Sequence, residues 1–185
     1  MRIYFNFLLL ISVMTLQWAC QSSQKTEADK TPEAPSQTIH EAAFLGNTKA
    51  IEQHIQAGSD LNVKDQYGST ALTIAALFNK PEVAKLLIDA NADIHVTSAD
   101  GSTPLHTAAF LCRIEIVEAL LAKGANKELT NSFGSTPLQS VQAPFESVKP
   151  AYDQISRDLG PLGFKLDYDF LEENRQVIAE MLTNQ

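Results

Sequence analysis

The stretch STPLHTAAFLCRIEIVEALLAKGAN (102–126) carries the signals of two short helices separated by a turn. Thr103 is a favoured helix N-cap, because its hydroxyl accepts a backbone N–H, and Pro104 at the first helical position loses no hydrogen bond. The alanine pair 108–109 falls inside this first helix. A second helix is predicted by apolar residues in an i, i+1, i+4, i+5 pattern. These residues are Ile116, Val117, Leu120 and Leu121.

The same pattern returns at a strict period of 33 residues. GSTAL at 68–72 becomes GSTPL at 101–105 and again at 134–138. The leading glycine suits a tight turn, because it adopts positive φ without steric cost. A fixed period of this length predicts a solenoid of stacked units. Three further stretches share the spacing: AAFLG (42–46), AALFN (75–79) and AAFLC (108–112).

These motifs resemble the ankyrin repeat, and residues 102–126 are very close to the family's pattern. The resemblance covers residues 38–185 and implies an all-α solenoid of about four helix–turn–helix units with fingers that resemble β-hairpins. It also implies that the chain binds a protein partner. His40 and His106 occupy the histidine position of the TPLH motif, where the imidazole is expected to bond the backbone of a neighbouring loop. The units are expected at about 38–64, 65–97, 98–130 and 131–185.

The turn between the two helices of a unit is expected to need a left-handed backbone. Gly46 meets this need, and its counterparts in the next units are Asn79 and Cys112. Asparagine tolerates this geometry, whereas cysteine pays about 1 kcal/mol for it.

The fourth unit is expected to contain an insert at about 145–172. Pro144 shortens its first helix, and the second-helix pattern returns at 177–182, about 28 residues later than the period requires. Inside the insert a helix is predicted with Pro150 near its start and Gly160-Pro161 as its stop. Asp169 followed by Glu172 predicts the cap of the final helix. The insert helix should bury one face, formed by Tyr152, Ile155 and Leu159.

Residues 1–19 have the features of a secretory signal. Arg2 precedes an apolar run, Ile3 to Leu16, that is shorter than the roughly 20 residues needed to span a bilayer. Ala19-Cys20 resembles a bacterial lipoprotein cleavage site, which implies that Cys20 is the first mature residue and carries acyl chains. Gln21 is not the aspartate that retains many such proteins at the inner membrane, so the resemblance favours the outer membrane, facing the periplasm.

Residues 20–37 are expected to be a flexible tether, because between Gln21 and Gln37 no apolar side chain is larger than alanine. The chain has a formal charge of −8, which becomes −9 when Arg2 is removed with the signal. Such a charge argues against nucleic acid as a partner and against adsorption on anionic lipid. Attachment to a membrane would therefore depend on the lipid anchor alone.

No pattern of catalytic or metal-binding residues stands out, so no cofactor, metal or catalytic residue is predicted. The four histidines lack the i,i+3 or i,i+4 spacing that zinc ligands on one helix require. Cys112 lies six residues after His106, about 9 Å along a helix, which is too far for a dyad. The acidic residues 167–173 are explained as charge at a helix N-terminus. The alternative is a cation site.

The bulky pairs that follow the alanine pairs are expected to border a concave groove beneath the fingers, as successive rungs about 10 Å apart. Aromatic anchors with a polar edge are typical of protein interfaces. The alternative is that one residue of each pair packs into the core. The proposed groove residues are Phe44, Leu45, Gln66, Tyr67, Leu77, Phe78, Asp100, Phe110, Leu111 and Phe133.

The sequence thus predicts a monomeric, non-catalytic interaction module that is lipid-anchored in the bacterial envelope and holds a partner protein in its groove. An alternative hypothesis places the function in the insert, as an enzyme or a cation-dependent sensor that uses the repeats as a scaffold. The insert itself has two interpretations: a lid over the last repeat, or a second binding or regulatory element.

Overall fold

A computed structural model of the chain describes residues 33–184, and these residues form helices joined by loops, with no strand. The signal at 1–19, Cys20 and most of the expected tether lie outside the described residues. Of the helices in the described range, none is long and apolar enough to cross a membrane.

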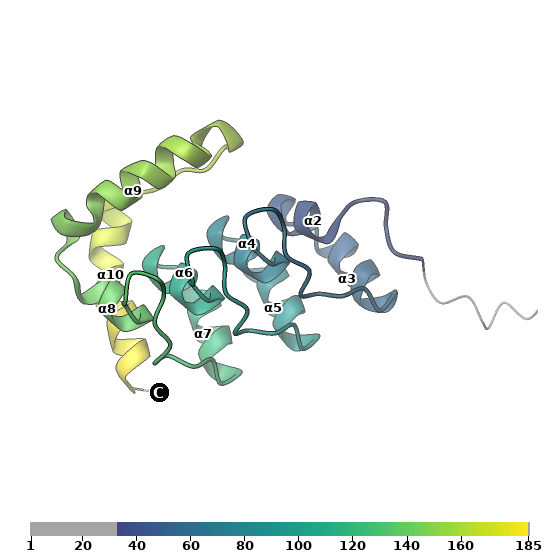
Figure 1. Cartoon of the computed structure of the whole chain (residues 1–185), viewed down its shortest axis with the longest axis horizontal. Coiled ribbons are helices and arrows are strands. Elements are labelled where there is room, and N and C mark those ends of the chain that lie inside the picture. Colours follow the sequence, from purple (N-terminus) through teal and green to yellow (C-terminus); the bar gives the residue numbers. More distant parts are fainter. Residues whose placement is uncertain (1–32, 185) are drawn as a thin grey trace, which may run out of the picture. The chain divides into compact units, whose positions relative to one another are not determined.

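The helices follow one another in antiparallel pairs, as Figure 1 shows. The first pair is α2 (Ile39–Leu45) and α3 (Thr48–Gln56), followed by α4 (Ala71–Leu77) and α5 (Pro81–Asp89). The third pair is α6 (Pro104–Phe110) and α7 (Ile114–Ala122), and the fourth begins with α8 (Pro137–Gln142). Then come α9 (Phe145–Leu159), a 3-10 turn η2 (Gly160–Leu162) and α10 (Tyr168–Asn184).

The pairs stack side by side in the order of the chain. The first helices α2, α4, α6 and α8 form one layer, and each contacts the next; α3, α5 and α7 form a second layer in the same way. Helix α10 packs against α8 and α7, so it completes the fourth pair although α9 and η2 intervene in the sequence. This arrangement confirms the all-α solenoid, and among the helices of residues 33–184 it leaves α9 and η2 outside the two layers.

Local signals in the sequence place the helix ends. The first helix of every pair is capped by a threonine side chain, and His106 and Gln139 complete capping boxes in α6 and α8. The turns after α2, α4 and α6 have the predicted left-handed residues, with φ of 75° at Gly46, 54° at Asn79 and 52° at Cys112. The capping threonines are Thr38, Thr70, Thr103 and Thr136.

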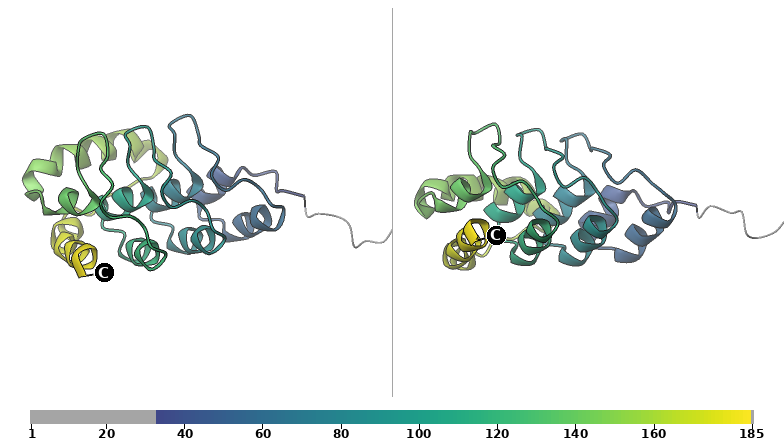
Figure 2. Two further views of the ribbon diagram at one scale, coloured as in Figure 1. Left: turned by 60° about the horizontal axis from the view of Figure 1, so that its bottom comes forward. Right: turned by 90° about the horizontal axis from the view of Figure 1, so that it is seen from below.

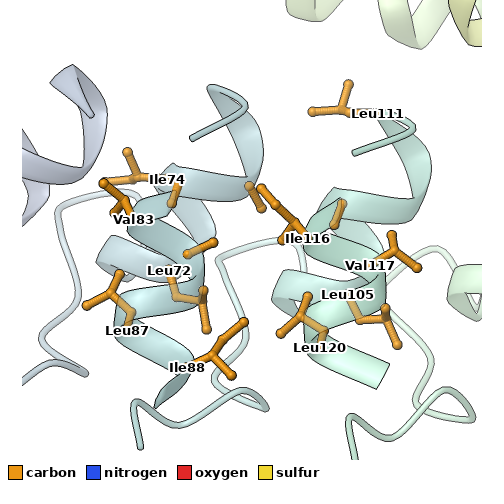
Figure 3. Close-up of a cluster of buried hydrophobic side chains, with 14 of the residues drawn as sticks. Leu72, Ile74, Val83, Leu87, Ile88, Leu105, Leu111, Ile116, Val117 and Leu120 are labelled. Atoms are coloured by element: carbon orange, nitrogen blue, oxygen red, sulfur yellow. The ribbon is translucent and has the colours of Figure 1, made fainter. Parts of the chain in front are cut away.

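The core lies between the two layers. Alanine pairs on the first helices are fully buried, which allows neighbouring helices to approach closely. Branched side chains from both layers fill the space around them (Figure 3). The largest contributions in the second and third units come from Leu72, Val83, Leu87, Leu105, Ile116 and Leu120, each no more than 1% exposed.

The loops that join one pair to the next project as fingers on one side of the stack (Figure 2). Neighbouring fingers are joined by backbone hydrogen bonds: Ala99 N donates to Tyr67 O over 3.3 Å, and Ser132 N donates to Asp100 O over 2.9 Å. Gly101 has φ of 75°, and a Cβ at this position would lie 2.9 Å from Ser132 N. The fingers are therefore held in contact by features that repeat along the chain.

The structure differs from the prediction at the start of α9 and at the start of α10. It begins at Phe145, so Pro150 lies inside the helix and not near its start. The final helix begins at Tyr168, where Asp167 Oδ1 accepts the Phe170 N–H over 3.0 Å; the cap is Asp167 and not Asp169. The predicted stop is confirmed, since α9 ends at Leu159 and Gly160 opens η2.

Candidate interaction groove

The bulky pairs of the first helices do not form one continuous open surface. Phe44, Leu77 and Phe110 occupy the same repeat position and are all half-buried against the core. At the next position the exposure of the side chain decreases along the stack: Leu45 is 56% exposed, Phe78 is half-buried, and Leu111 is 1% exposed. Leu111 therefore lines the groove described below, as predicted, but as a buried side chain and not as an open one.

The segment after α8 explains this gradient. Figure 1 shows α9 running from the α8–α10 end of the stack back toward the earlier pairs. The Tyr152 ring stacks on Phe110 with 4.4 Å between centroids, and the Phe164 ring meets Phe78 edge-on at 5.7 Å. Phe78 also packs edge-on against Phe44 at 4.6 Å. The chain itself thus covers the outer ends of the second and third rungs.

A buried polar network anchors this cover. The Tyr152 hydroxyl donates to Phe110 O over 2.7 Å, and Arg175 Nη1 of α10 donates to the same hydroxyl over 2.9 Å. Arg175 Nη2 donates to the carbonyls of Ser140 and Ala143 at the end of α8. Tyr152 and Arg175 are 0% and 5% exposed, so three helices meet at one solvent-shielded cation.

The surface that stays open is a groove of about 680 Å³ between the fingers and α9. Its floor is formed by the first helices, with Leu77, Phe110 and Leu111 as the largest apolar side chains. The finger wall includes Tyr67, Asp100 and Phe133. The opposite wall is one face of α9, formed by Val148, Ala151, Gln154 and Ile155. The groove is mostly apolar, with hydroxyl and amide groups around it.

Three predicted residues stand at the same position of successive fingers, 33 residues apart: Tyr67, Asp100 and Phe133. The two rings are 68% and 78% exposed, and Asp100 between them is also exposed. Gln66 is exposed beside Tyr67 but does not line the groove. The fingers thus present two aromatic rings and one carboxylate in a row along one side of the groove.

Asp100 is held as a carboxylate. Partial desolvation raises its pKa, but hydrogen bonds from Ser98 Oγ, Ser102 N and Ser102 Oγ outweigh this effect, and the pKa lies below its ordinary value. Hydrogen bonds to an anion favour the ionised form. Asp100 is the only charged side chain among the residues that line the groove.

His106 lies at the edge of the groove floor and has a structural role. Burial lowers its pKa, and the neutral ring accepts from Thr103 N at Nδ1 over 3.2 Å. Its Nε2 bonds Ser135 O over 3.1 Å, as His40 Nε2 bonds Val63 O over 2.8 Å. The expected bond from this histidine to a neighbouring loop is confirmed in both units.

The other residues considered for catalysis or metal binding also have structural roles. Burial raises the pKa of Cys112 to about 11, and its thiol donates to Leu171 O over 3.7 Å, so it stays protonated. Asp167 caps α10. Within residues 33–184 no three His, Cys, Asp or Glu side chains gather into a group that could hold a metal ion.

The sequence analysis did not predict the part of this site that α9 and α10 supply. Gln154 and Ala151 of α9 line the groove, yet only the buried face of that helix was predicted. Arg175, which fixes α9, lies on a helix predicted from apolar residues alone, and nothing in its local sequence signals burial. Its burial depends on three acceptors, the Tyr152 hydroxyl and the carbonyls of Ser140 and Ala143, which come together only in the folded chain.

A family model described as ankyrin repeats, three copies, matches residues 39–139, which is more than half of the chain. The chain belongs to the ankyrin repeat family. It is also similar to the ankyrin repeat domain-containing protein SAT10 of Stachybotrys chartarum (strain CBS 109288 / IBT 7711), with 37% identity over 49 residues. That alignment covers 26% of this chain and only 2% of the length of SAT10.

Proposed function

We propose that this protein is a non-catalytic interaction module that binds a partner protein in the groove between its fingers and α9. Ankyrin repeats are typically protein–protein interaction modules, which supports this class of function. The observation that carries the proposal is the exposure of two large rings, Tyr67 and Phe133, at the mouth of a mostly apolar groove. Exposed aromatic side chains of this kind are common anchors in protein interfaces.

The module is held at the bacterial envelope by acyl chains on Cys20, in this proposal, and faces the periplasm from the outer membrane. Its support is the sequence Ala19-Cys20 after an apolar segment and the polar residues that follow it. Each buried CH₂ of an acyl chain contributes about 0.8 kcal/mol, so two or three chains would hold the protein without a transmembrane helix.

The groove is tested by affinity capture from native envelopes with the wild-type protein and with the double variant Tyr67→Ala/Phe133→Ala. Both side chains are exposed, so the variant should fold normally and lose the partner. Phe170→Ala/Val177→Ala is the matched control, because it removes two exposed apolar side chains of α10, each 41% exposed, that do not line the groove. Equal capture by all three proteins would refute the groove.

The anchor has its own test. The wild-type protein should fractionate with membranes, and mass spectrometry of its N-terminal peptide should show Cys20 as the first residue with acyl chains attached. Cys20→Ser should release the protein into the soluble fraction. An unmodified Cys20 in the membrane-bound protein would contradict lipid anchoring and leave the groove proposal intact.

A further inference from the structure

The chemistry of the groove narrows the kind of segment that fits it. Its volume is about 680 Å³. Helix α9 already packs along the open ends of the first helices, where it stacks on Phe110 through Tyr152. The space that is left is bounded by the fingers on one side and by α9 on the other.

The charge of the groove is one-sided. Asp100 is its only charged lining residue, and the buried His106 on the floor is neutral. The carboxylate is exposed, and it is fixed in place by Ser98 and Ser102. On the opposite wall, Arg157 donates to the side chain of Gln154 over 2.8 Å, so the α9 side has a cation near its rim. A cationic group of a partner is therefore attracted to the finger side.

The neighbours of Asp100 strengthen this preference. Tyr67 and Phe133 lie at the same position of the fingers on either side, and the backbone bonds between fingers fix their order. Aromatic faces attract a cation, and they also pack against the aliphatic stem of lysine or arginine. The chain as a whole has a formal charge of −8, which draws a cationic segment at long range.

We infer that the partner presents a segment in which a lysine or arginine meets Asp100 between Tyr67 and Phe133, while an adjacent large apolar side chain lies on Leu77 and Phe110. This inference rests on the proposed function, because it specifies the chemistry of a protein partner in the same groove. It adds a charge requirement that an apolar groove alone would not impose.

The probe is a phage-displayed library of random 12-residue peptides, selected on the full-length protein. The selected peptides should carry lysine or arginine next to a large apolar residue. Asp100→Asn should weaken their binding roughly five- to thirty-fold, because a charge-assisted hydrogen bond is lost. Glu118→Gln is the matched control, since it removes an equal charge from an exposed site on α7 and should leave binding unchanged.

A substitution in the peptide controls for any disturbance of the finger that Asp100→Asn itself causes. Replacing the peptide's arginine or lysine by glutamine should weaken binding to the wild-type protein as much as Asp100→Asn does. The same replacement should have little effect on binding to the Asp100→Asn variant, because the two changes remove one interaction. Binding of the charged peptide to the wild-type protein should weaken as salt is raised.

The outcomes separate the two proposals. Peptides that lose binding with Tyr67→Ala/Phe133→Ala but show no cation and no response to Asp100→Asn would overturn the charge requirement and leave the groove standing. Peptides that bind regardless of the ring variants would overturn the groove itself. A selection that yields no binding peptide also counts against both, because a cationic residue next to a large apolar one is then not enough for binding in the groove.

Discussion

Tyr152 of α9 is joined to Phe110 of α6 twice: its ring stacks on the Phe110 ring at 4.4 Å, and its hydroxyl donates to the Phe110 carbonyl over 2.7 Å. The two residues are 42 positions apart in the chain. Because Phe110 ends the first helix of the third unit, this contact places the C-terminal segment on the face of the stack that would otherwise be open. The groove has α9 as a wall for this reason.

The hydroxyl of Tyr152 should therefore add to the stability of the fold beyond what the packing of its ring contributes. Tyr152→Phe removes a buried bond to Phe110 O and leaves one donor of Arg175 without its acceptor, so we expect a loss of about 1–3 kcal/mol in the free energy of unfolding. Tyr168→Phe is the matched control, because Tyr168 is only half-buried, whereas Tyr152 is fully buried, and its hydroxyl bonds the half-buried Asp153 and Ser156. Urea unfolding of both variants measures the difference, and equal losses would contradict a special role for Tyr152.

Contact between fingers can be measured with two glycines of identical backbone geometry. Gly101 and Gly134 have φ of 75° and 74°, so alanine is strained at both by about 1–2 kcal/mol. A Cβ at Gly101 would meet Ser132 N at 2.9 Å, whereas a Cβ at Gly134 meets nothing within 4 Å. Gly101→Ala should therefore lower the melting temperature more than Gly134→Ala. Identical effects would mean that the second and third fingers do not pack as described.

Protonation of His106 should make the fold sensitive to mild acid. Burial lowers its pKa in the folded state below the ordinary value of 6.5, so the folded state disfavours the charged ring. The free energy of unfolding should stay level above about pH 7.5 and fall as the pH drops through 6.5 toward the lower folded pKa. A proton on Nδ1 would also face the Thr103 N–H that it now accepts.

His106→Gln provides the comparison for this pH dependence. Glutamine completes the same cap in α8, where Gln139 Oε1 accepts from Thr136 N over 2.9 Å. The variant should keep the fold at neutral pH and lose stability less steeply between pH 7.5 and 5.5. Denaturant unfolding at several pH values measures both slopes, and parallel curves would show that His106 does not contribute.

The thiol of Cys112 should react only when the fold opens. It is 2% exposed, and burial raises its pKa to about 11, so little thiolate forms at pH 8. In a Cys20→Ser variant, where Cys112 is the only cysteine, alkylation by iodoacetamide should be slower than that of a free thiol by at least a factor of 100. Urea near the unfolding midpoint should restore the rate. Fast alkylation of the native protein would contradict the burial of this turn.

Local sequence determined most of the repeat architecture. The threonine caps, the proline at the first helical position and the left-handed residues at the turns act within four or five residues of one another, so the pattern of 102–126 already contains two helices and their ends. The period of 33 then fixes how the pairs stack, because each unit can bury its apolar face only against an equivalent neighbour. The exposed finger residues followed from the same register.

Tertiary structure alone decided which of the repeated side chains stay open. Leu45, Phe78 and Leu111 have equivalent positions and similar chemistry, yet their exposure falls along the stack. Phe164, in the segment after α9, packs on Phe78, and Tyr152 of α9 stacks on Phe110, the neighbour of Leu111. That cover depends on Arg175 of α10 meeting Tyr152 of α9 and the carbonyls of Ser140 and Ala143 at the end of α8, at least 23 positions away in the sequence. Local patterns do not encode such a meeting point, because its energy comes from acceptors that converge only after the chain has folded.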